Sequence, residues 1–268
     1  MSEPNSADPA RFYESYLVRY FFGPWARDLL ERARPQAGEC VLDLACGTGA
    51  LTREVLKHIG PHGSVIGVDI SPDMLRVASE VVGSHGGVVE WRQGSAEALP
   101  LPDASIDLAV CQQGLQFFPD KLEALCQLKR VLKPGGRMAL SVWRGIEHWP
   151  VQHALSRAAH GRLGRAITPA FGFGEHGVLE RLLTETGFQR VRVDVVEKTV
   201  MFPSADEFVG VTVNGAAAVL PELKAMSQPE RAELVATVWA EVESTIRSYT
   251  RDGQLQVPTA AHLATALT

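Results

Sequence analysis

Short runs of apolar residues alternate with longer amphipathic stretches through the first half of the chain. The apolar runs at residues 41–45, 65–69, 87–91, 106–111 and 137–143 have the length and residue types of buried strands. The stretches between them carry apolar residues at helical spacing. Because parallel strands need a crossover of a dozen or more residues, this alternation predicts an α/β fold with helices on both faces of a sheet.

The two ends of the chain follow a different pattern. Residues 11–33 carry aromatic and aliphatic side chains at helical spacing, interrupted once by a Gly-Pro pair, which predicts two short helices. The alternation of strands and helices lapses over residues 144–184. Two apolar runs, 191–197 and 198–202, then follow one another with no room for a helix, so we expect them to pair antiparallel. Residues 204–268 have a helical pattern.

Composition and charge narrow the class of protein. Of the 268 residues, 46% are hydrophobic and 21% are charged, as in soluble globular proteins. The net charge of -5, without a long basic run, argues against binding to nucleic acid or to anionic lipid. No secretory signal is visible, and no apolar run approaches the ~20 residues that span a bilayer. The four cysteines lack zinc-ligand spacing, so we expect a cytoplasmic protein with no bound metal and no membrane insertion.

A glycine-rich turn follows the first predicted strand and is the most informative segment of the chain. Gly47 and Gly49 lie where that strand gives way to a helix, so a ligand can approach the backbone and the free N–H groups of the helix start. Asp69 ends the second predicted strand, 22 residues after Gly47, and a carboxylate there can accept both hydroxyl hydrogens of a ribose. These features predict a site for a nucleoside-containing ligand.

Two residues near the turn favour a cationic ligand over a dinucleotide. Thr52 stands where the dinucleotide fingerprint has its third glycine. Asp43 places a carboxylate just before the turn, where it would repel a pyrophosphate and attract an ammonium or sulfonium group, unless it caps the following helix. A nicotinamide-dependent oxidoreductase is therefore a disfavoured alternative.

Four motifs in order carry a family resemblance. They are VLDLACGTG (41–49), VIGVDISPDML (65–75), GSAEALPLPDASID (94–107) and LKPGGRMALSVW (132–143). Together they resemble the class I S-adenosylmethionine-dependent methyltransferases, and most closely the small-molecule branch that includes the ubiquinone/menaquinone biosynthesis methyltransferases. The resemblance covers about residues 35–203.

The resemblance implies a Rossmann-like, seven-stranded mixed sheet whose last strand is antiparallel and lies at about residues 198–202, together with a helical cap. It also implies S-adenosyl-L-methionine as the cofactor. Ser95 stands where the family often has an aspartate that accepts from the adenine amino group. Carried over residue by residue, the implied cofactor site consists of Asp43, Ala45, Gly47, Gly49, Asp69, Ile70, Met74, Ser95, Ala96 and Gln112.

Candidates for the acceptor and for catalysis lie outside these motifs. Methyl transfer from a sulfonium is an in-line displacement that needs alignment and exclusion of water, and a general base helps only when the acceptor must lose a proton. His148 and His153, in the segment after the fifth strand, are the candidates for that base. The expected substrate contacts are Tyr16, Tyr20, Gln113, Gln116, Phe117 and Trp143.

The expected organisation is a helical segment over the active site (1–34), a cofactor-binding core (35–203) with a cap insertion at about 144–186, and a C-terminal helical segment (204–268). We expect this protein to methylate a small, aromatic or lipophilic acceptor. One alternative is an RNA or protein methyltransferase, which the acidic charge balance disfavours, as does Cys-Gln-Gln-Gly in place of an Asn-Pro-Pro-Tyr-like motif after the fourth strand. Another is a protein that binds S-adenosylmethionine without catalysis.

Overall fold

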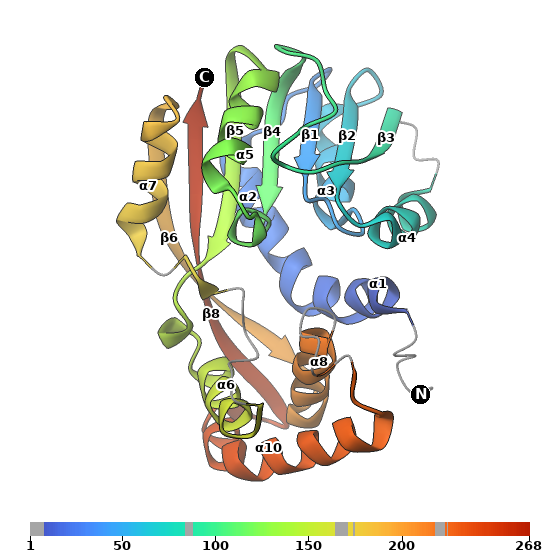
Figure 1. The fold of residues 1–268 in the computed structure, drawn as a ribbon, viewed down its shortest axis with the longest axis vertical. Helices are drawn as coiled ribbons and strands as arrows, with labels where there is room; N and C mark the ends of the chain where they lie inside the picture. The colour runs from blue at the N-terminus through green and yellow to red at the C-terminus, as the bar shows by residue number, and fades with distance from the viewer. Residues whose placement is uncertain (1–7, 84–87, 164–170, 174, 218–222, 224) are drawn as a thin grey trace.

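A single mixed sheet carries the fold, with the strand order β3-β2-β1-β4-β5-β8-β6 (Figure 1). The computed structural model describes residues 8–83, 88–163, 171–173, 175–217, 223 and 225–268. The strands are β1 (Cys40–Leu44), β2 (Ser64–Asp69), β3 (Val88–Gln93), β4 (Ile106–Gln112), β5 (Leu132–Trp143), β6 (Gln189–Phe202), β7 (Thr250–Arg251) and β8 (Gln254–Leu267). Strands β1 to β5 pair parallel, as predicted, while β8 runs antiparallel to both β5 and β6.

Helices connect the strands and form the cap. They are α1 (Pro9–Phe12), η1 (Tyr13–Phe22, π-helical), α2 (Gly23–Ala33), α3 (Ala50–Ile59), α4 (Pro72–Val82), η2 (Leu115–Phe117), α5 (Lys121–Val131), η3 (Ile146–His148), α6 (Pro150–Leu163), α7 (His176–Glu185), α8 (Ala205–Ala217) and α10 (Gln228–Ser248). None of these helices, over the residues described, is long and apolar enough to span a membrane.

The sheet is buried on both faces because successive side chains of its central strands point in opposite directions. Leu108 and Val110 of β4 belong to the core shared with α2 and α3, whereas Ala109 and Cys111 belong to the core shared with α5 and α7. This two-sided burial explains why the central strands appear in the sequence as continuous apolar runs. It confirms the predicted α/β fold with helices on both faces.

The antiparallel strand is not the one that the sequence pattern predicted. Residues 191–197 and 198–202 form one continuous strand, β6, rather than a pair of strands. Its antiparallel partner is β8, which lies in the segment predicted to be helical and inserts between β5 and β6. Strand β8 is rich in alanine and leucine and pairs with a neighbour on both sides along most of residues 261–267. The prediction failed because these pairings are long-range and leave no local periodicity.

The cap is built from two insertions and the N-terminal segment. Figure 1 shows α6, α8 and α10 packed around the far ends of β6 and β8, beyond the end of β5. Within the segment 144–186, predicted to be a cap insertion, α6 joins the cap while α7 packs on β6 and β8. The predicted C-terminal segment 204–268 is wrong as a unit, because its helices are an insertion between β6 and β8.

Candidate functional site

A cavity of about 460 Å³ lies at the carboxyl ends of the parallel strands, beneath the cap. Strand ends supply one wall, through Ala45 after β1, Asp69 of β2 and Gln112 of β4. The N-terminal segment and the cap supply the other, through Tyr13, Phe21 and Gln152 among others. Ligands of open α/β sheets bind at this edge, so the topology alone makes the cavity the candidate site.

The glycine turn forms the floor of the cavity with an unusual backbone. Ala45 and Gly47 both have positive φ, 55° and 54°, and both line the cavity. A left-handed conformation at alanine is costly and persists where the surrounding structure requires it, which is common at ligand sites. A Cβ on Gly47 would lie at an ordinary contact distance of 3.4 Å from the Tyr13 ring, so the positive φ, and not a lack of space, favours glycine there.

Gly49, predicted to contact the cofactor, has a different role. It does not line the cavity, and a Cβ there would lie 2.9 Å from Trp91 and 3.0 Å from Val82, on the side of the protein core. Its φ of 80° also favours glycine. Gly49 is therefore required by the packing behind the turn, where α3 begins, rather than by the approach of a ligand.

Asp69 is held in a fixed orientation at the end of β2. Its Oδ2 accepts from the N–H of Gly47 at 2.8 Å, and its Oδ1 accepts from the N–H of Ser71 at 2.9 Å. Burial raises the pKa of the carboxyl, and the backbone hydrogen bonds oppose that rise. Because each carboxylate oxygen has a second lone pair, Asp69 can still accept two hydroxyl hydrogens from a ligand in the cavity that it lines.

Asp43 lies behind the turn and not on the cavity wall. Its side chain is 1% exposed, and its Oδ2 accepts from the Thr52 hydroxyl at 2.6 Å on the first turn of α3. Burial raises its pKa to about 7, against hydrogen bonds from the hydroxyl and backbone N–H of Thr52. The structure thus shows the helix-capping arrangement. Asp43 acts on the cavity through its negative field, and the repulsion from Asp69 raises its pKa further.

The residues that the family resemblance assigns to the adenine line the cavity. Ile70, Met74, Ser95 and Ala96, all predicted, line it together. The Ser95 hydroxyl is engaged, because it donates a short hydrogen bond to the Glu97 carboxylate. Glu97 also lines the cavity and was missed, although it lies in the same GSAEALP motif. A carboxylate is therefore present in this part of the cavity, two residues after the serine that replaces the family's aspartate.

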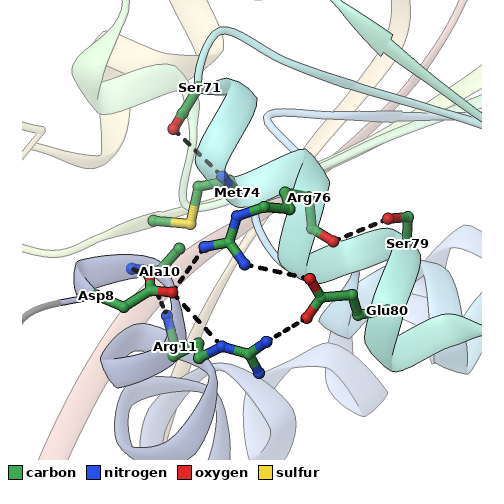
Figure 2. Close-up of polar contacts among 8 residues, drawn as sticks. All are labelled: Asp8, Ala10, Arg11, Ser71, Met74, Arg76, Ser79 and Glu80. Carbon is green, nitrogen blue, oxygen red and sulfur yellow. Dashed lines mark hydrogen bonds and ion pairs between the residues drawn. The ribbon is translucent and has the colours of Figure 1, made fainter. Parts of the chain in front are cut away.

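Four charged side chains fasten the N-terminal segment to α4 beside this part of the cavity (Figure 2). Arg76 Nη2 lies 2.7 Å from Asp8 Oδ2, and Arg76 Nη1 lies 3.2 Å from Glu80 Oε1. Arg11 Nη2 lies 2.5 Å from the other oxygen of Glu80. Asp8 also caps α1 by accepting from the N–H groups of Ala10 and Arg11, so the same carboxylate starts the helix and anchors it.

We expect Arg76→Gln to speed dissociation of the cofactor roughly 2- to 5-fold, because it removes both ion pairs between this arginine and its partners while leaving the cavity wall intact. Stopped-flow tryptophan fluorescence with S-adenosylhomocysteine measures the rate. The difference from wild type should shrink at high salt, since exposed pairs are screened. Arg247→Gln, which breaks a similar helix-surface pair with Glu243 on α10, is the control and should leave the rate unchanged.

The N-terminal aromatic residues divide into lining and anchoring groups. Tyr13 lines the cavity, and burial holds its pKa well above the usual range, so its hydroxyl stays protonated. Tyr16 and Tyr20, predicted as substrate contacts, do not line it. Tyr16 stacks on Phe12 at 5.0 Å, and the Tyr20 hydroxyl donates to Glu207 of α8 at 2.7 Å. These two tyrosines fix the position of η1 instead of contacting a ligand.

The turn after β4 brings three predicted side chains to the cavity. Gln112, Gln113 and Phe117 line it, whereas Gln116 does not and instead accepts from the Trp143 N–H at 3.0 Å. Gln112 Nε2 donates to the carbonyl of Phe22 at 2.7 Å and so ties η1 to the sheet. Gln113 is 3% exposed, has a φ of 56°, and has no hydrogen-bond partner for either amide atom among the described residues.

Aromatic and cap residues complete the acceptor end of the cavity. Trp143, predicted, lines it with Trp149 and Phe171, and the ring of Trp149 packs edge-on to both others at 4.7 and 5.1 Å. Gln152 of α6 and Thr212 of α8 also line it and were missed. Nothing local in the sequence marks these cap residues, because only the packing of α6 and α8 over the sheet brings them to the site.

The predicted general bases are not brought to the cavity. Neither His148 of η3 nor His153 of α6 is among the described residues that line it, although Trp149 and Gln152 between them are. His148 Nε2 instead lies 3.5 Å from the carboxylate of its neighbour Glu147. Among the described lining residues, only Tyr13, Asp69 and Glu97 have titratable side chains, and none is a histidine.

Comparisons with known proteins agree with this geometry. A family model described as a methyltransferase domain matches residues 41–136, which span β1 to the start of β5. A ubiquinone/menaquinone biosynthesis C-methyltransferase of Marinomonas sp. is 42% identical over 150 residues, 55% of this chain and 58% of that protein. The chain spans about half the length of such curated relatives.

One relative matches over a much longer stretch. Nocamycin O-methyltransferase of Saccharothrix syringae is 30% identical over 232 residues, 81% of this chain and 81% of that protein, so the similarity extends into the cap. Among solved structures, the YcgJ protein of Bacillus subtilis has a TM-score of 0.60 at 20% identity and covers 91% of this chain and 97% of its own. That structural match supports the fold.

Proposed function

This chain belongs to the class I S-adenosylmethionine-dependent methyltransferases of the small-molecule branch, and we propose that it transfers a methyl group to a small aromatic or lipophilic acceptor. The observation that supports this best is the single cavity wall that combines the strained turn at Ala45 and Gly47 with the carboxylate of Asp69. The aromatic side chains of the cap face the same cavity, so cofactor and acceptor would share it.

The residues present fit S-adenosylmethionine. Gly47 lines the cavity with a positive φ that favours glycine, and Asp69 keeps free lone pairs toward the cavity. Asp69 would accept the ribose hydroxyls, and Ile70, Met74 and Glu97 would surround the adenine. When bound, the cofactor supplies an electrophilic methyl group on a positively charged sulfur.

The chain's own contribution is alignment, exclusion of water and a favourable field. Trp143, Trp149 and Phe22 give the acceptor an apolar wall that excludes water, and correct positioning alone contributes ~7–11 kcal/mol to such reactions. The carboxylates of Asp43 and Asp69 favour a cation at the turn, and their effect is larger in a buried site than in water. No lining histidine is needed for these functions.

The alternatives have less support. A nicotinamide dinucleotide would bring its pyrophosphate to a turn flanked by Asp43 and Asp69. For nucleic acid, the lining carries carboxylates and no cationic side chain among the described residues, so phosphates would find no partner. We further propose that the protein works in the cytoplasm, since all four of its cysteines are free thiols, as is usual in a reducing compartment.

Calorimetry with S-adenosylmethionine, S-adenosylhomocysteine and NADH tests the cofactor assignment. We expect binding of the first two and none of NADH, and tight NADH binding without the others would refute the proposal. Mass spectrometry of a metabolite extract incubated with protein and S-adenosylmethionine then tests catalysis. A product heavier by one methyl substitution is expected, absent when S-adenosylhomocysteine replaces the donor. Cofactor binding without any methylated product would favour the non-catalytic alternative.

A further inference from the structure

Gln113 is a buried polar side chain on the cavity wall, and its amide makes no hydrogen bond within the described protein. It is 97% buried, lines the cavity, and neither its Oε1 nor its Nε2 has a hydrogen-bond partner among the described residues. Leaving a buried amide unpaired is unfavourable, so such groups are rare unless a ligand or water completes them. The arrangement indicates that something bound in the cavity supplies both a donor and an acceptor.

The position of Gln113 is set firmly by the fold. Its backbone N–H donates to the carbonyl of Ser141 at 2.9 Å, which continues the pairing of β4 with β5 by one residue. Its positive φ turns the chain there, and the following Gly114 packs so closely that a Cβ would lie 2.7 Å from the Cβ of Ala45. Gln113 therefore lies beside the cofactor turn, where the cofactor and acceptor parts of the cavity meet.

The charged side chains that line the cavity indicate the charge of a molecule that would pair with Gln113. Among the described lining residues only Asp69 and Glu97 carry charges, and both belong to the cofactor end of the cavity. The acceptor end is formed by aromatic rings, Gln113, Gln152 and Thr212, and the buried Oε1 of Gln152 also has no hydrogen-bond partner within the described part of the chain. An anionic acceptor would find no cationic side chain among the described lining residues, and burying a charge without a protein partner is strongly unfavourable.

We propose that Gln113 determines acceptor specificity by pairing with a neutral aromatic molecule that carries a hydrogen-bond donor beside an acceptor on one edge, as in a lactam or a hydroxy-ketone. A carboxamide presents an N–H and a carbonyl oxygen side by side, so it forms two parallel hydrogen bonds with such an edge. Gln152 lies on the cap side of the same cavity and offers a further acceptor. This inference rests on the proposed function and specifies its substrate class.

The test uses the full chain saturated with S-adenosylhomocysteine and four probes of similar size: 2-quinolone, 1-methyl-2-quinolone, quinoline and 2-naphthoate. Only 2-quinolone has the neighbouring donor and acceptor. By calorimetry we expect it to bind roughly 5- to 150-fold more tightly than quinoline or the N-methyl compound, the range typical of satisfying a buried polar group. Naphthoate, an anion, should bind more weakly than 2-quinolone.

In Gln113→Met, which keeps the size of the side chain and removes its polar atoms, the preference for 2-quinolone should fall to near unity. Gln127→Met on α5, a half-buried glutamine that does not line the cavity, is the matched control and should keep the wild-type preference. The affinity for S-adenosylhomocysteine is measured in all three proteins, so that the probes are compared with each protein saturated. The wild-type comparison needs no variant, so it remains decisive if Gln113→Met does not fold.

Equal affinities for the neutral probes, stronger binding of naphthoate, binding of no probe, or a preference that survives in Gln113→Met would each overturn this inference. These failures are distinct from failure of the proposed function, which would appear earlier as a wild-type protein that does not bind S-adenosylhomocysteine. A protein that binds the cofactor but shows no preference among the probes keeps its place as a methyltransferase and loses only the role assigned to Gln113.

Discussion

Replacing Asp69 by alanine is expected to weaken cofactor binding by about 1–3 kcal/mol, roughly 5- to 150-fold, because it removes a charged acceptor from buried hydroxyls. The side chain does two things at once in the structure. It lines the cavity, and it holds the N–H groups of Gly47 and Ser71 at 2.8 and 2.9 Å. The variant therefore loses a ligand contact and also loosens the turn that shapes the cavity floor.

The two effects can be separated by a more conservative change and by a matched control. Asp69→Asn keeps one oxygen acceptor for the turn, so it should fold with near wild-type stability yet still bind S-adenosylhomocysteine less tightly by calorimetry. Asp107→Ala is the control, since Asp107 also accepts a backbone N–H, from Cys40 at 2.9 Å, but at the opposite end of the sheet. It should lower the melting temperature without changing affinity. Unchanged binding in Asp69→Ala would contradict the ribose assignment.

Asp43→Asn is expected to have opposite effects on the free protein and on the complex. Its pKa of about 7 lies well above the usual carboxyl value of 3.8, so the folded protein holds a proton that the unfolded chain has released between those two values. The free energy of unfolding therefore falls as pH rises from about 4 to about 7, and the loss is complete above pH 7. The asparagine variant does not ionise, so it should be more stable than wild type at pH 8.

We expect the gain in the free energy of unfolding to be roughly 1–3 kcal/mol at pH 8, since part of it is offset where the new amide must share the Thr52 hydroxyl. The gain should vanish near pH 4, because Asp43 is protonated there in the folded wild-type protein. Denaturant unfolding at both pH values measures it. Cofactor affinity should move the other way. In wild type the affinity for S-adenosylmethionine should rise from pH 6 to pH 8 as Asp43 ionises, and this rise should flatten in the variant.

A pair of results would contradict the electrostatic role of Asp43. If Asp43→Asn were no more stable than wild type at pH 8, the carboxylate would not carry the desolvation penalty that its burial implies. If the variant bound S-adenosylmethionine with wild-type affinity and the same pH dependence, the negative field behind the turn would make no contribution. Thr52→Val offers a second variant, since it removes the hydroxyl that donates to Asp43 and should raise the carboxyl pKa further.

The alternation of strands and helices up to β5, and the glycine turn after β1, were predictable because their signals are local. Each parallel strand is a short apolar run, and two of the helices between them begin with a side-chain cap, Ser71 before α4 and Asp120 before α5. The motif at residues 41–49 needs only its own glycines and the carboxylate of Asp69 to define a nucleoside site. Each of these features can be predicted from one segment of the chain or from two neighbouring segments.

The residues predicted to bind the cofactor do not all line the cavity. Gly47 and Asp69 lie on the cavity wall as the motifs imply, but Gly49 serves the packing of Trp91, and Asp43 caps α3. A motif shows which residue types the turn requires and does not show which side of the turn each one faces. Only the positions of the neighbouring strands and helices distinguish contact with a ligand from support of the fold.

The amino-acid sequence by itself thus specifies the α/β class, the parallel part of the sheet and the cofactor turn, because hydrophobic periodicity, caps and glycine positions act over a few residues. Strand β8, the cap and the acceptor wall depend on tertiary contacts. An alanine-rich segment is extended only because β5 and β6 lie on either side of it, and Gln152 reaches Gln113's cavity only because α6 folds back over the sheet. Such contacts join residues that are dozens of positions apart, and more than a hundred for β5 and β8, so no local pattern records them.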